Sequence, residues 1–216
     1  MFKKECLRLY FVAGSQDCVH LSGDSGEQLL NILEQALQSG ITCFQFREKG
    51  QYALKQKDEI WALAQKCQKL CQKYQVPFVI DDDLPMALAL GADGLHIGQS
   101  DIAIHEAIKQ LPEKMFLGVS ANNLNELSGS LNPHVDYFGV GPIFTTSSKE
   151  DADKAIGIEA ISIMKQAAKN TPIVAIGGIG VNDVATIMHA GADGVAVISA
   201  ITRADNVSET VRLLLA

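Results

Sequence analysis

Carboxylate side chains cluster directly after two short apolar segments near the middle of the chain. Three consecutive aspartates, 81–83, follow the segment 78–80, and Asp101 lies just beyond the segment 95–97. Neighbouring strands of a parallel sheet would bring these side chains together, because such sheets bind ligands at the carboxyl ends of their strands. Converging carboxylates prefer hard cations such as Mg²⁺. Aspartates after strands also cap helices and form turns, and at this point that alternative stays open.

A second group of polar side chains lies at the end of the segment 41–50, ITCFQFREKG. Strand alternation would place Gln45 and Arg47 on one face and Phe44 and Phe46 on the other. Inward-facing glutamine and arginine are costly in a barrel unless they meet a polar ligand or paired groups. Arg47 and Lys49 therefore predict a phosphate or diphosphate site, with a solvated basic turn as the alternative.

Two further stretches have the composition of phosphate-binding loops. Gly177 and Gly178 follow the apolar segment 173–176 and precede a helical pattern, so their backbone amides could approach an anion closely. Together with Ile198 and Ser199, they occupy the position of the phosphate site near the last two strands of many α/β barrels.

The loop 145–149, TTSSK, offers hydroxyls and one ammonium group that could grip a diphosphate. By itself, this loop is equally typical of a flexible, solvated connection. His96 alternates with apolar neighbours and is expected to line the barrel, either as a hydrogen-bonded core residue or as a catalytic one.

The elements that must position these residues repeat along the chain. Apolar runs predict strands over 7–12, 78–80, 95–97, 116–120, 135–140, 173–176 and 194–198, and a further strand lies within the segment 41–50. Helical spacing predicts helices over 27–37, 54–74, 84–90, 102–111, 122–127, 158–168, 181–189 and 207–215. The tetrapeptide Gly-Ala-Asp-Gly occurs at 91–94 and again at 191–194, four units apart. Eight strand–helix units without a linker predict a single (β/α)₈ TIM barrel, class α/β, over residues 1–216.

Length and composition agree with this fold and exclude several functions. A chain of 216 residues with 47% hydrophobic residues has the size of one such barrel. The net charge of −7 argues against a nucleic-acid surface, which needs a basic stripe. The sequence contains no apolar run of 18 residues, and the N-terminal segment lacks the long apolar core of a signal peptide. We expect a cytoplasmic protein with no membrane partner and leave a homo-oligomer open.

Six blocks, taken in order, resemble the thiamine-phosphate synthase family. They are FQFREK (44–49), IDDDLPMAL with GADGLHIGQSD (80–101), LGVSA (117–121), DYFGVGPIFTTSSK (136–149), AIGGIG (175–180) and GADGVAVISAI (191–201). The resemblance implies a (β/α)₈ barrel that requires Mg²⁺ and joins hydroxymethylpyrimidine diphosphate to hydroxyethylthiazole phosphate. The products would be thiamine phosphate and diphosphate.

The resemblance also implies roles for individual residues. Arg47, Ser120 and Lys149 would be catalytic, with Ser120 beside the reacting pyrimidine and the leaving oxygen. The metal would be held by Asp82 and Asp101. The substrates would be bound by Gln45, Arg47, Lys49, Asp81, Ser120, Thr146, Ser148, Lys149, Gly178, Ile198 and Ser199. Within this set, the last three form the cradle for the thiazole phosphate, which Thr146 and Ser148 also contact.

Two positions depart from the family pattern. Asp81 stands where the family usually has asparagine, and an added carboxylate should repel a diphosphate unless it is protonated or faces the metal. Ser148 replaces a threonine and keeps the hydroxyl. The implied reaction needs no general base, because the attacking thiazole nitrogen carries a free lone pair.

Two other functions compete with the synthase. A related thiazole tautomerase shares the barrel but uses a histidine after the strand that ends at Ser120, where this chain has Ala121, Asn122 and Asn123. A non-catalytic barrel that binds a phosphorylated ligand would be expected to lack the metal carboxylates, which this chain retains.

Overall fold

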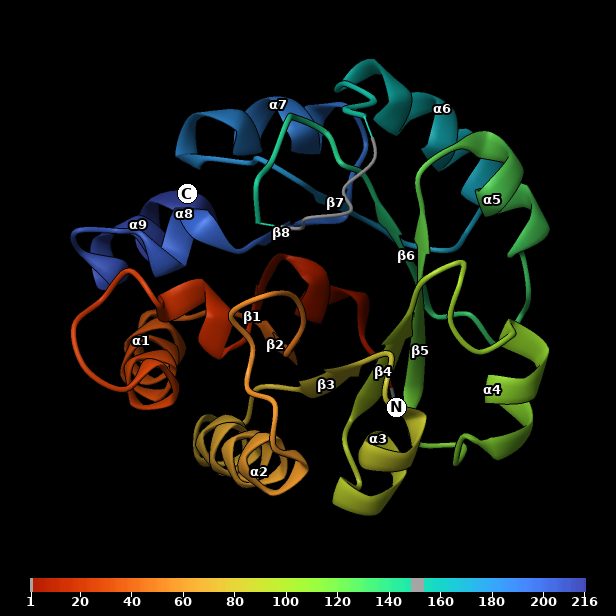
Figure 1. The fold of residues 1–216 in the computed structure, drawn as a ribbon. Helices are drawn as coiled ribbons and strands as arrows, with labels where there is room; N and C mark the ends of the chain where they lie inside the picture. The colour runs from red at the N-terminus through yellow and green to blue at the C-terminus, as the bar shows by residue number, and fades with distance from the viewer. Residues whose placement is uncertain (1, 149–153) are drawn as a thin grey trace.

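The computed structural model describes residues 2–148 and 154–216 and contains eight parallel strands that close into a barrel (Figure 1). The strands are β1 (Leu9–Ala13), β2 (Cys43–Phe46), β3 (Phe78–Asp81), β4 (Gly94–Ile97), β5 (Phe116–Ala121), β6 (Tyr137–Val140), β7 (Ile173–Ile176) and β8 (Gly194–Val197). Each strand pairs with its neighbours in chain order, and β8 pairs with β1. The predicted (β/α)₈ barrel is confirmed.

A ring of helices surrounds the strands (Figure 1). The α-helices are α1 (Ser25–Ser39), α2 (Lys57–Tyr74), α3 (Leu84–Leu90), α4 (Ile104–Gln110), α5 (Leu124–Gly129), α6 (Glu159–Ala168), α7 (Val184–His189), α8 (Ser199–Thr202) and α9 (Val207–Leu215). Short 3₁₀ helices occur at η1 (Lys4–Leu7), η2 (Ser15–Cys18) and η3 (Val181–Asp183). No helix of the described residues is long and apolar enough to cross a membrane.

Helix boundaries differ from the predicted ones where capping residues decide them. Helix α1 begins two residues earlier than predicted because the Asp24 side chain accepts a hydrogen bond from the amide of Glu27. Asn123 caps α5 in the same way, so that helix begins at Leu124 instead of residue 122. The predicted helix 54–74 begins only at Lys57, because the amide of Leu54 donates to the Glu48 side chain. Helix α8 was not predicted; four residues are too few for a periodic pattern.

Strand alternation separates two apolar layers. Tyr10, Cys43 and Tyr137 pack inside the barrel, whereas Phe44 and Phe46 pack between the strands and the helices. The predicted orientation of β2 is therefore confirmed. Because Gln45 shares the inward face with Cys43, its side chain is delivered into the barrel interior and is only 4% exposed.

The repeated tetrapeptide Gly-Ala-Asp-Gly forms the same junction twice. The Asp93 carboxylate accepts a hydrogen bond from the amide of Phe78, at the start of β3. The Asp193 carboxylate does the same for Ile173, at the start of β7. Each aspartate thus satisfies the first amide of the preceding strand and ties two neighbouring strands together at the end of the barrel opposite the predicted site.

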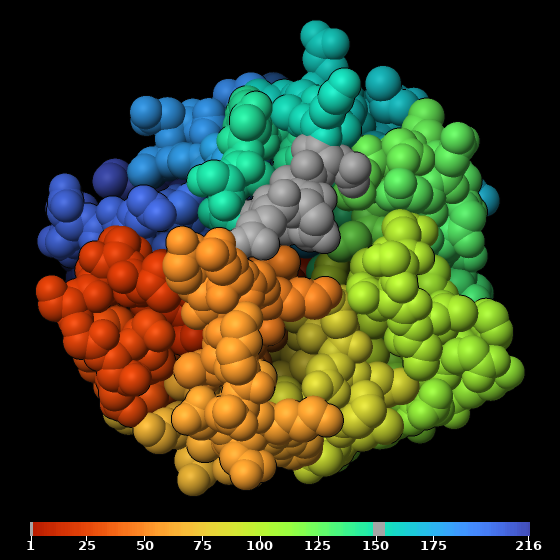
Figure 2. All heavy atoms as spheres, in the orientation of Figure 1, coloured from red at the N-terminus to blue at the C-terminus, as the bar shows by residue number. Residues whose placement is uncertain are grey.

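Figure 2 shows the molecule in the same orientation, with a hollow at the centre of this face beside the orange segment that follows β2. This face carries the carboxyl ends of the strands, where α/β barrels place their active sites.

Candidate active site

A cavity of about 340 Å³ opens at the carboxyl ends of the strands and contains the predicted site. All twelve predicted site residues in the described part of the chain line it: Gln45, Arg47, Lys49, Asp81, Asp82, Asp101, Ser120, Thr146, Ser148, Gly178, Ile198 and Ser199. The thirteenth, Lys149, lies outside the described residues. Positions up to 154 residues apart in the sequence thus meet at one cavity because parallel strands all end at the same rim.

The acidic side of the cavity is formed by the ends of β3 and β4. The amide of Asp82 donates to the carbonyl of His96 over 2.8 Å, which fixes the two strand ends together. Asp82 has a φ of 60°, in the left-handed region that aspartate and asparagine tolerate better than most residues. Its carboxylate is bound by the ammonium of Lys49 and hydrogen bonded to the carboxyl of Asp101.

The pKa values of the two hydrogen-bonded carboxyls are shifted in opposite directions. Burial raises the pKa of Asp101, and its hydrogen bond to Asp82 raises it further. Burial also opposes the charge of Asp82, but the hydrogen bonds from Asp101 and Lys49 prevail and its pKa is lowered. A proton shared between the pair therefore resides on Asp101. The hydrogen-bonded carboxyls of Asp82 and Asp101 could bind a divalent cation in place of the proton between them.

Asp81 lies deeper than Asp82, with its side chain about 10% exposed. Burial raises its pKa to about 7, and the charge of Asp82 adds to this effect. Arg47, whose Nε lies 3.5 Å from the Asp81 carboxylate, opposes the shift, as does Lys49. Asp81 is therefore a carboxyl that titrates near neutral pH inside the cavity.

Replacing Asp81 by asparagine is expected to remove a pH-dependent loss of stability. Asp81 keeps its proton up to about pH 7 in the folded chain but only to about pH 3.9 when unfolded. Between these values the folded state binds more protons. The free energy of unfolding therefore falls as pH rises, by at most about 1.4 kcal/mol per pH unit for one group. Urea titrations from about pH 5 to about pH 7.5 in chelator should show a smaller fall in the variant.

Asp82, Asp101, Arg47 and Lys49 surround Asp81 and remain in that variant, and because the Asp81 carboxyl helps to lower the pKa of Asp82, the difference between the two proteins measures Asp81 together with its effect on Asp82. An equal loss of stability in wild type and variant would show that Asp81 is ionised throughout this range.

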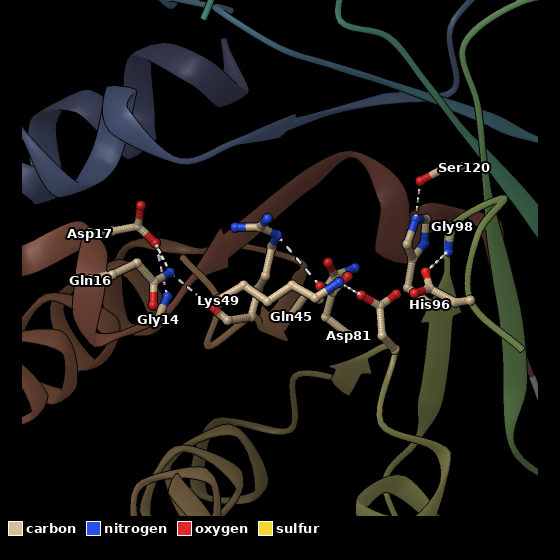
Figure 3. A network of polar contacts seen from close by, with 12 residues as sticks. Gly14, Gln16, Asp17, Gln45, Lys49, Asp81, His96, Gly98 and Ser120 are labelled. Atoms are coloured by element: carbon tan, nitrogen blue, oxygen red, sulfur yellow. Dashed lines mark hydrogen bonds and ion pairs between the residues drawn. The ribbon is translucent and has the colours of Figure 1, made fainter. Parts of the chain in front are cut away.

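Ser120 lies on β5 with its hydroxyl facing the cavity. Its Oγ is 2.9 Å from Nε2 of His96 (Figure 3). The side-chain amide of Gln99 donates to the Ser120 carbonyl over 2.6 Å and to the Ser130 hydroxyl over 3.1 Å. His96 is buried and also lines the cavity. It is therefore a hydrogen-bonded core residue, one of the two predicted possibilities, and it also contacts the candidate site.

The opposite side of the cavity is formed by the ends of β7 and β8. Gly177 and Gly178 have φ values of 101° and 66°, which favour glycine. A Cβ on Gly178 would lie 2.7 Å from the carbonyl oxygen of Thr145, so this backbone also passes too close to its neighbour for a side chain. Strand β8 ends at Val197, one residue before the predicted end at Ile198, and Ser199 begins α8. The backbone and hydroxyl groups on this side suit an anion.

Sequence reasoning missed a polar brace that holds the cationic segment. Glu48, between Arg47 and Lys49, points away from the cavity and accepts hydrogen bonds from the amide of Ser15 over 2.9 Å and from its hydroxyl. The amide of Leu54 donates to the same carboxylate over 2.8 Å. The sequence Arg-Glu-Lys contained a signal for this arrangement. Successive side chains of an extended segment point to opposite sides, so Glu48 would face away from Arg47 and Lys49.

The backbone on the other side of this brace is clamped as well. The Gln16 side chain donates to the carbonyl of Arg47 over 2.7 Å, and a Cβ on Gly14 would lie 2.1 Å from the same oxygen (Figure 3). Glu48 and Gln16 together fix the path from which the Arg47 side chain extends.

Replacing Glu48 by alanine is expected to lower the free energy of unfolding by about 1–3 kcal/mol, because partly buried donors lose their acceptor. The same change should raise KM for an anionic substrate, because Arg47 and Lys49 lose the backbone that aims them. Chemical denaturation and steady-state kinetics measure the two effects. Glu59→Ala, an exposed position on α2, is the matched control. Equal free energies of unfolding and equal KM values in the two variants would show that the hydrogen bonds of Glu48 do not stabilise this segment.

Asn122 and Glu126 also line the cavity and were not predicted. The Glu126 carboxylate accepts from the amide of Asn122 over 2.8 Å and from the Asn123 side chain over 2.6 Å. Within residues 2–148 and 154–216, no group of three or more His, Cys, Asp or Glu side chains is arranged to hold a metal by itself.

Comparison with known proteins identifies relatives over nearly the whole chain. The family described as thiamine monophosphate synthase matches residues 9–201. A thiamine-phosphate synthase of Pasteurella multocida (strain Pm70) is 50% identical over 210 residues, covering 97% of this chain and 95% of the relative. That of Histophilus somni (strain 129Pt) is also 50% identical, with the same coverage.

Solved structures agree with these matches. The thiamine phosphate pyrophosphorylase of Pyrococcus furiosus superposes with a TM-score of 0.82 at 28% identity, covering 98% of this chain and 95% of that one. The orotidine 5'-phosphate decarboxylase of Pyrococcus horikoshii superposes with a TM-score of 0.67 at 14% identity, covering 95% of this chain and 97% of that one. At that identity the second likeness reflects the barrel fold alone.

Proposed function

Because the chain belongs to the thiamine monophosphate synthase family, we propose that it joins hydroxymethylpyrimidine diphosphate to hydroxyethylthiazole phosphate. The bond from the pyrimidine methylene carbon to the diphosphate oxygen breaks, and its electron pair leaves with the diphosphate. The lone pair of the thiazole nitrogen then attacks that carbon. The products are thiamine phosphate and diphosphate. The observation that carries the proposal is that every predicted site residue in the described part of the chain lines the same cavity.

The diphosphate is assigned to the side of the cavity near Arg47 and Lys49. A guanidinium presents several N–H donors in a planar fork that matches phosphate oxygens, and an ammonium adds a compact positive charge. The hydrogen bonds of Glu48 fix the backbone that carries both side chains. The two cations would meet a leaving group whose negative charge grows in the transition state. Preorganised cations of this kind are usually the largest contribution to such a reaction. Lys149 is proposed to add a further cation.

The donor set of the acidic side fits Mg²⁺, held by Asp82 and Asp101. Mg²⁺ in phosphate-transfer sites uses one or two carboxylates together with substrate phosphate oxygens and water. The charge balance supports this: four carboxyl groups of the described cavity wall face only the two cations Arg47 and Lys49. When bound, the cation neutralises charge on the departing diphosphate. Its binding at Asp82 would also release the Lys49 ammonium toward the substrate.

The remaining residues are assigned to the two organic groups and the second phosphate. Ser120 is proposed to donate its hydroxyl to the oxygen that leaves with the diphosphate. Thr146 and Ser148 are proposed to bind the thiazole phosphate, together with the cradle of Gly178, Ile198 and Ser199. Gln45 and Asp81 are assigned to the pyrimidine diphosphate side, where a protonated Asp81 would not repel an anion.

The proposal includes a cytoplasmic location and small, phosphorylated substrates, without nucleic-acid or membrane partners. The overall negative charge of the chain supports the exclusion of nucleic acids. A homo-oligomer is compatible with every assignment, because one chain supplies the whole cavity.

The tautomerase alternative is less well supported, because Ala121, Asn122 and Asn123 occupy the stretch after Ser120 where that activity needs a histidine. A non-catalytic binding barrel is less well supported because the carboxyls of Asp82 and Asp101 are in hydrogen-bonding contact at the cavity wall.

The proposed function is tested by measuring diphosphate release from the purified chain with both substrates, in Mg²⁺ or in excess chelator. Release that requires both substrates and the metal is the expected result. No release, with thiazole phosphate still bound in an equilibrium assay, would overturn the synthase proposal in favour of a binding barrel or a tautomerase.

A further inference from the structure

Five polar side chains form one continuous hydrogen-bonded chain across the interior of the barrel. Nε2 of Gln45 donates to the Tyr10 hydroxyl over 3.0 Å, and the Tyr10 hydroxyl lies 2.9 Å from that of Tyr137. The Tyr137 hydroxyl lies 2.9 Å from Nδ1 of His96, whose Nε2 lies 2.9 Å from Oγ of Ser120. The five residues come from five different strands, β2, β1, β6, β4 and β5. We call them the interior relay.

The interior relay is enclosed by the apolar floor of the barrel. Tyr10 and Tyr137 are at most 1% exposed, and His96 is 9% exposed. Burial raises the pKa of both tyrosines well above their usual value, so each keeps its single proton. A buried hydroxyl that lacks a hydrogen-bond partner costs free energy, so each tyrosine proton is expected to lie in a hydrogen bond to the next residue of the interior relay.

Two glycines leave room for the rings. A Cβ on Gly118 would lie 2.4 Å from the Tyr137 hydroxyl, and a Cβ on Gly139 would lie 3.1 Å from Cε1 of His96. Any side chain at Gly118 would displace the Tyr137 hydroxyl from its place between Tyr10 and His96. The absence of side chains at these two glycines therefore leaves the space that the rings of Tyr137 and His96 occupy.

The direction of the hydrogen bonds follows from counting protons. The side-chain nitrogen of Gln45 can only donate, so the Tyr10 oxygen accepts, and its one proton can go to the Tyr137 oxygen or to the Cys43 sulfur. Oxygen is the stronger acceptor, which favours donation to Tyr137. The one proton of Tyr137 then goes to Nδ1 of His96. A neutral imidazole that accepts at Nδ1 carries its proton on Nε2 and donates it to Ser120.

We propose that Tyr137 and His96 are positioning residues that orient the Ser120 hydroxyl so that its proton points into the cavity. Because Oγ of Ser120 accepts from His96, its own O–H is available to a ligand. The inference rests on the proposed function only in naming that ligand atom as the leaving diphosphate oxygen. If the Ser120 hydroxyl instead donated its proton to Nε2 of His96, only the lone pairs of its oxygen would face the ligand. Those lone pairs would repel the negative charge that develops on the leaving oxygen and would oppose departure of the diphosphate.

The first test reads the tautomer of His96 directly. The intact wild-type chain, labelled with ¹⁵N at histidine, is examined by NMR without substrate, and the His96 signals are assigned as those lost in His96→Gln. A protonated Nε2 and an unprotonated Nδ1 are expected. A protonated Nδ1 would overturn the proposal. Because no substrate is involved, this outcome is independent of whether the chain is a synthase.

The second test separates positioning from packing. Tyr137→Phe deletes the donor to Nδ1, so His96 can adopt either tautomer, and kcat should fall about tenfold or more with little change in KM. Tyr10→Phe deletes a hydroxyl from the same buried floor but leaves Tyr137 as the donor to His96. Its kcat should fall less than about threefold.

The NMR spectrum of Tyr137→Phe should show loss of the single His96 tautomer, whereas that of Tyr10→Phe should keep it. Equal losses of kcat with an unchanged tautomer in both variants would mean that the hydroxyls serve packing alone and would overturn the proposal. If Tyr137→Phe does not fold, the wild-type spectrum decides.

Discussion

Turnover of the Asp82→Asn variant is expected to fall by about a hundredfold to a thousandfold. The substitution keeps the size of the side chain and removes its charge, so the proposed metal loses one of two carboxylates. Asparagine tolerates the φ of 60° at this position, which protects the fold. Diphosphate release measured over a range of Mg²⁺ concentrations should show both the lower rate and a higher Mg²⁺ requirement.

The neighbouring Asp83→Asn is a stringent control for this result. Asp83 caps α3 by accepting from the amide of Met86 over 2.8 Å, and it does not line the cavity. Asparagine caps helices about as well as aspartate, so stability should also be preserved. A wild-type rate for Asp82→Asn, or equal losses in the two variants, would remove Asp82 from the metal site.

Replacing Arg47 by methionine is expected to lower kcat/KM for the pyrimidine diphosphate by about a hundredfold to a thousandfold. The guanidinium is less exposed than the ammonium of Lys49, with side chains 13% and 48% exposed, so water screens its charge weakly. Its loss would leave Asp81 without the partner whose Nε lies 3.5 Å away. Steady-state kinetics at saturating thiazole phosphate measures the change. Arg47→Lys should recover only part of it, because an ammonium lacks the planar fork.

The contribution of the unpaired Asp81 can be separated with the double variant Arg47→Met/Asp81→Asn. Because Arg47 lowers the pKa of Asp81, its removal should favour the protonated carboxyl, and the double variant should be about as active as Arg47→Met alone; a more active double variant would show that Asp81 is ionised and repels the diphosphate. Arg203→Met provides the control, because Arg203 lines a neighbouring cavity of about 480 Å³ beside Arg47 but is exposed and has no assigned role. An equal loss in Arg203→Met would mean that general attraction of anions, and not a specific contact, explains the effect.

These electrostatic predictions depend on local arrangement and not on the charge of the whole chain. The net charge of −7 should repel an anionic substrate at long range. Salt screens that repulsion over roughly 10 Å, whereas partly buried groups such as Arg47 are screened much less. Two cations fixed at one side of the cavity of an acidic protein are therefore consistent with a diphosphate substrate.

Much of the architecture was determined by the sequence because it is encoded locally. Alternation of apolar and polar residues placed Phe44 outside the barrel and Gln45 inside it, and both positions were confirmed. Eight apolar runs in a chain of this length left few arrangements other than a barrel. Since parallel strands end at one rim, polar residues that follow the runs had to meet there. For that reason all twelve predicted site residues described by the structure line one cavity.

The tertiary structure decided what depends on distances between residues far apart in the chain. The spacing of three aspartates does not reveal which one is buried, yet burial is what raises the pKa of Asp81 and distinguishes it from Asp82. The brace between Ser15 and Glu48 spans 33 positions, and the contact of Tyr10 with Tyr137 spans 127. No periodicity links such residues. Hydrogen bonds and desolvation act over a few ångströms in space, so only the folded chain shows which groups they join.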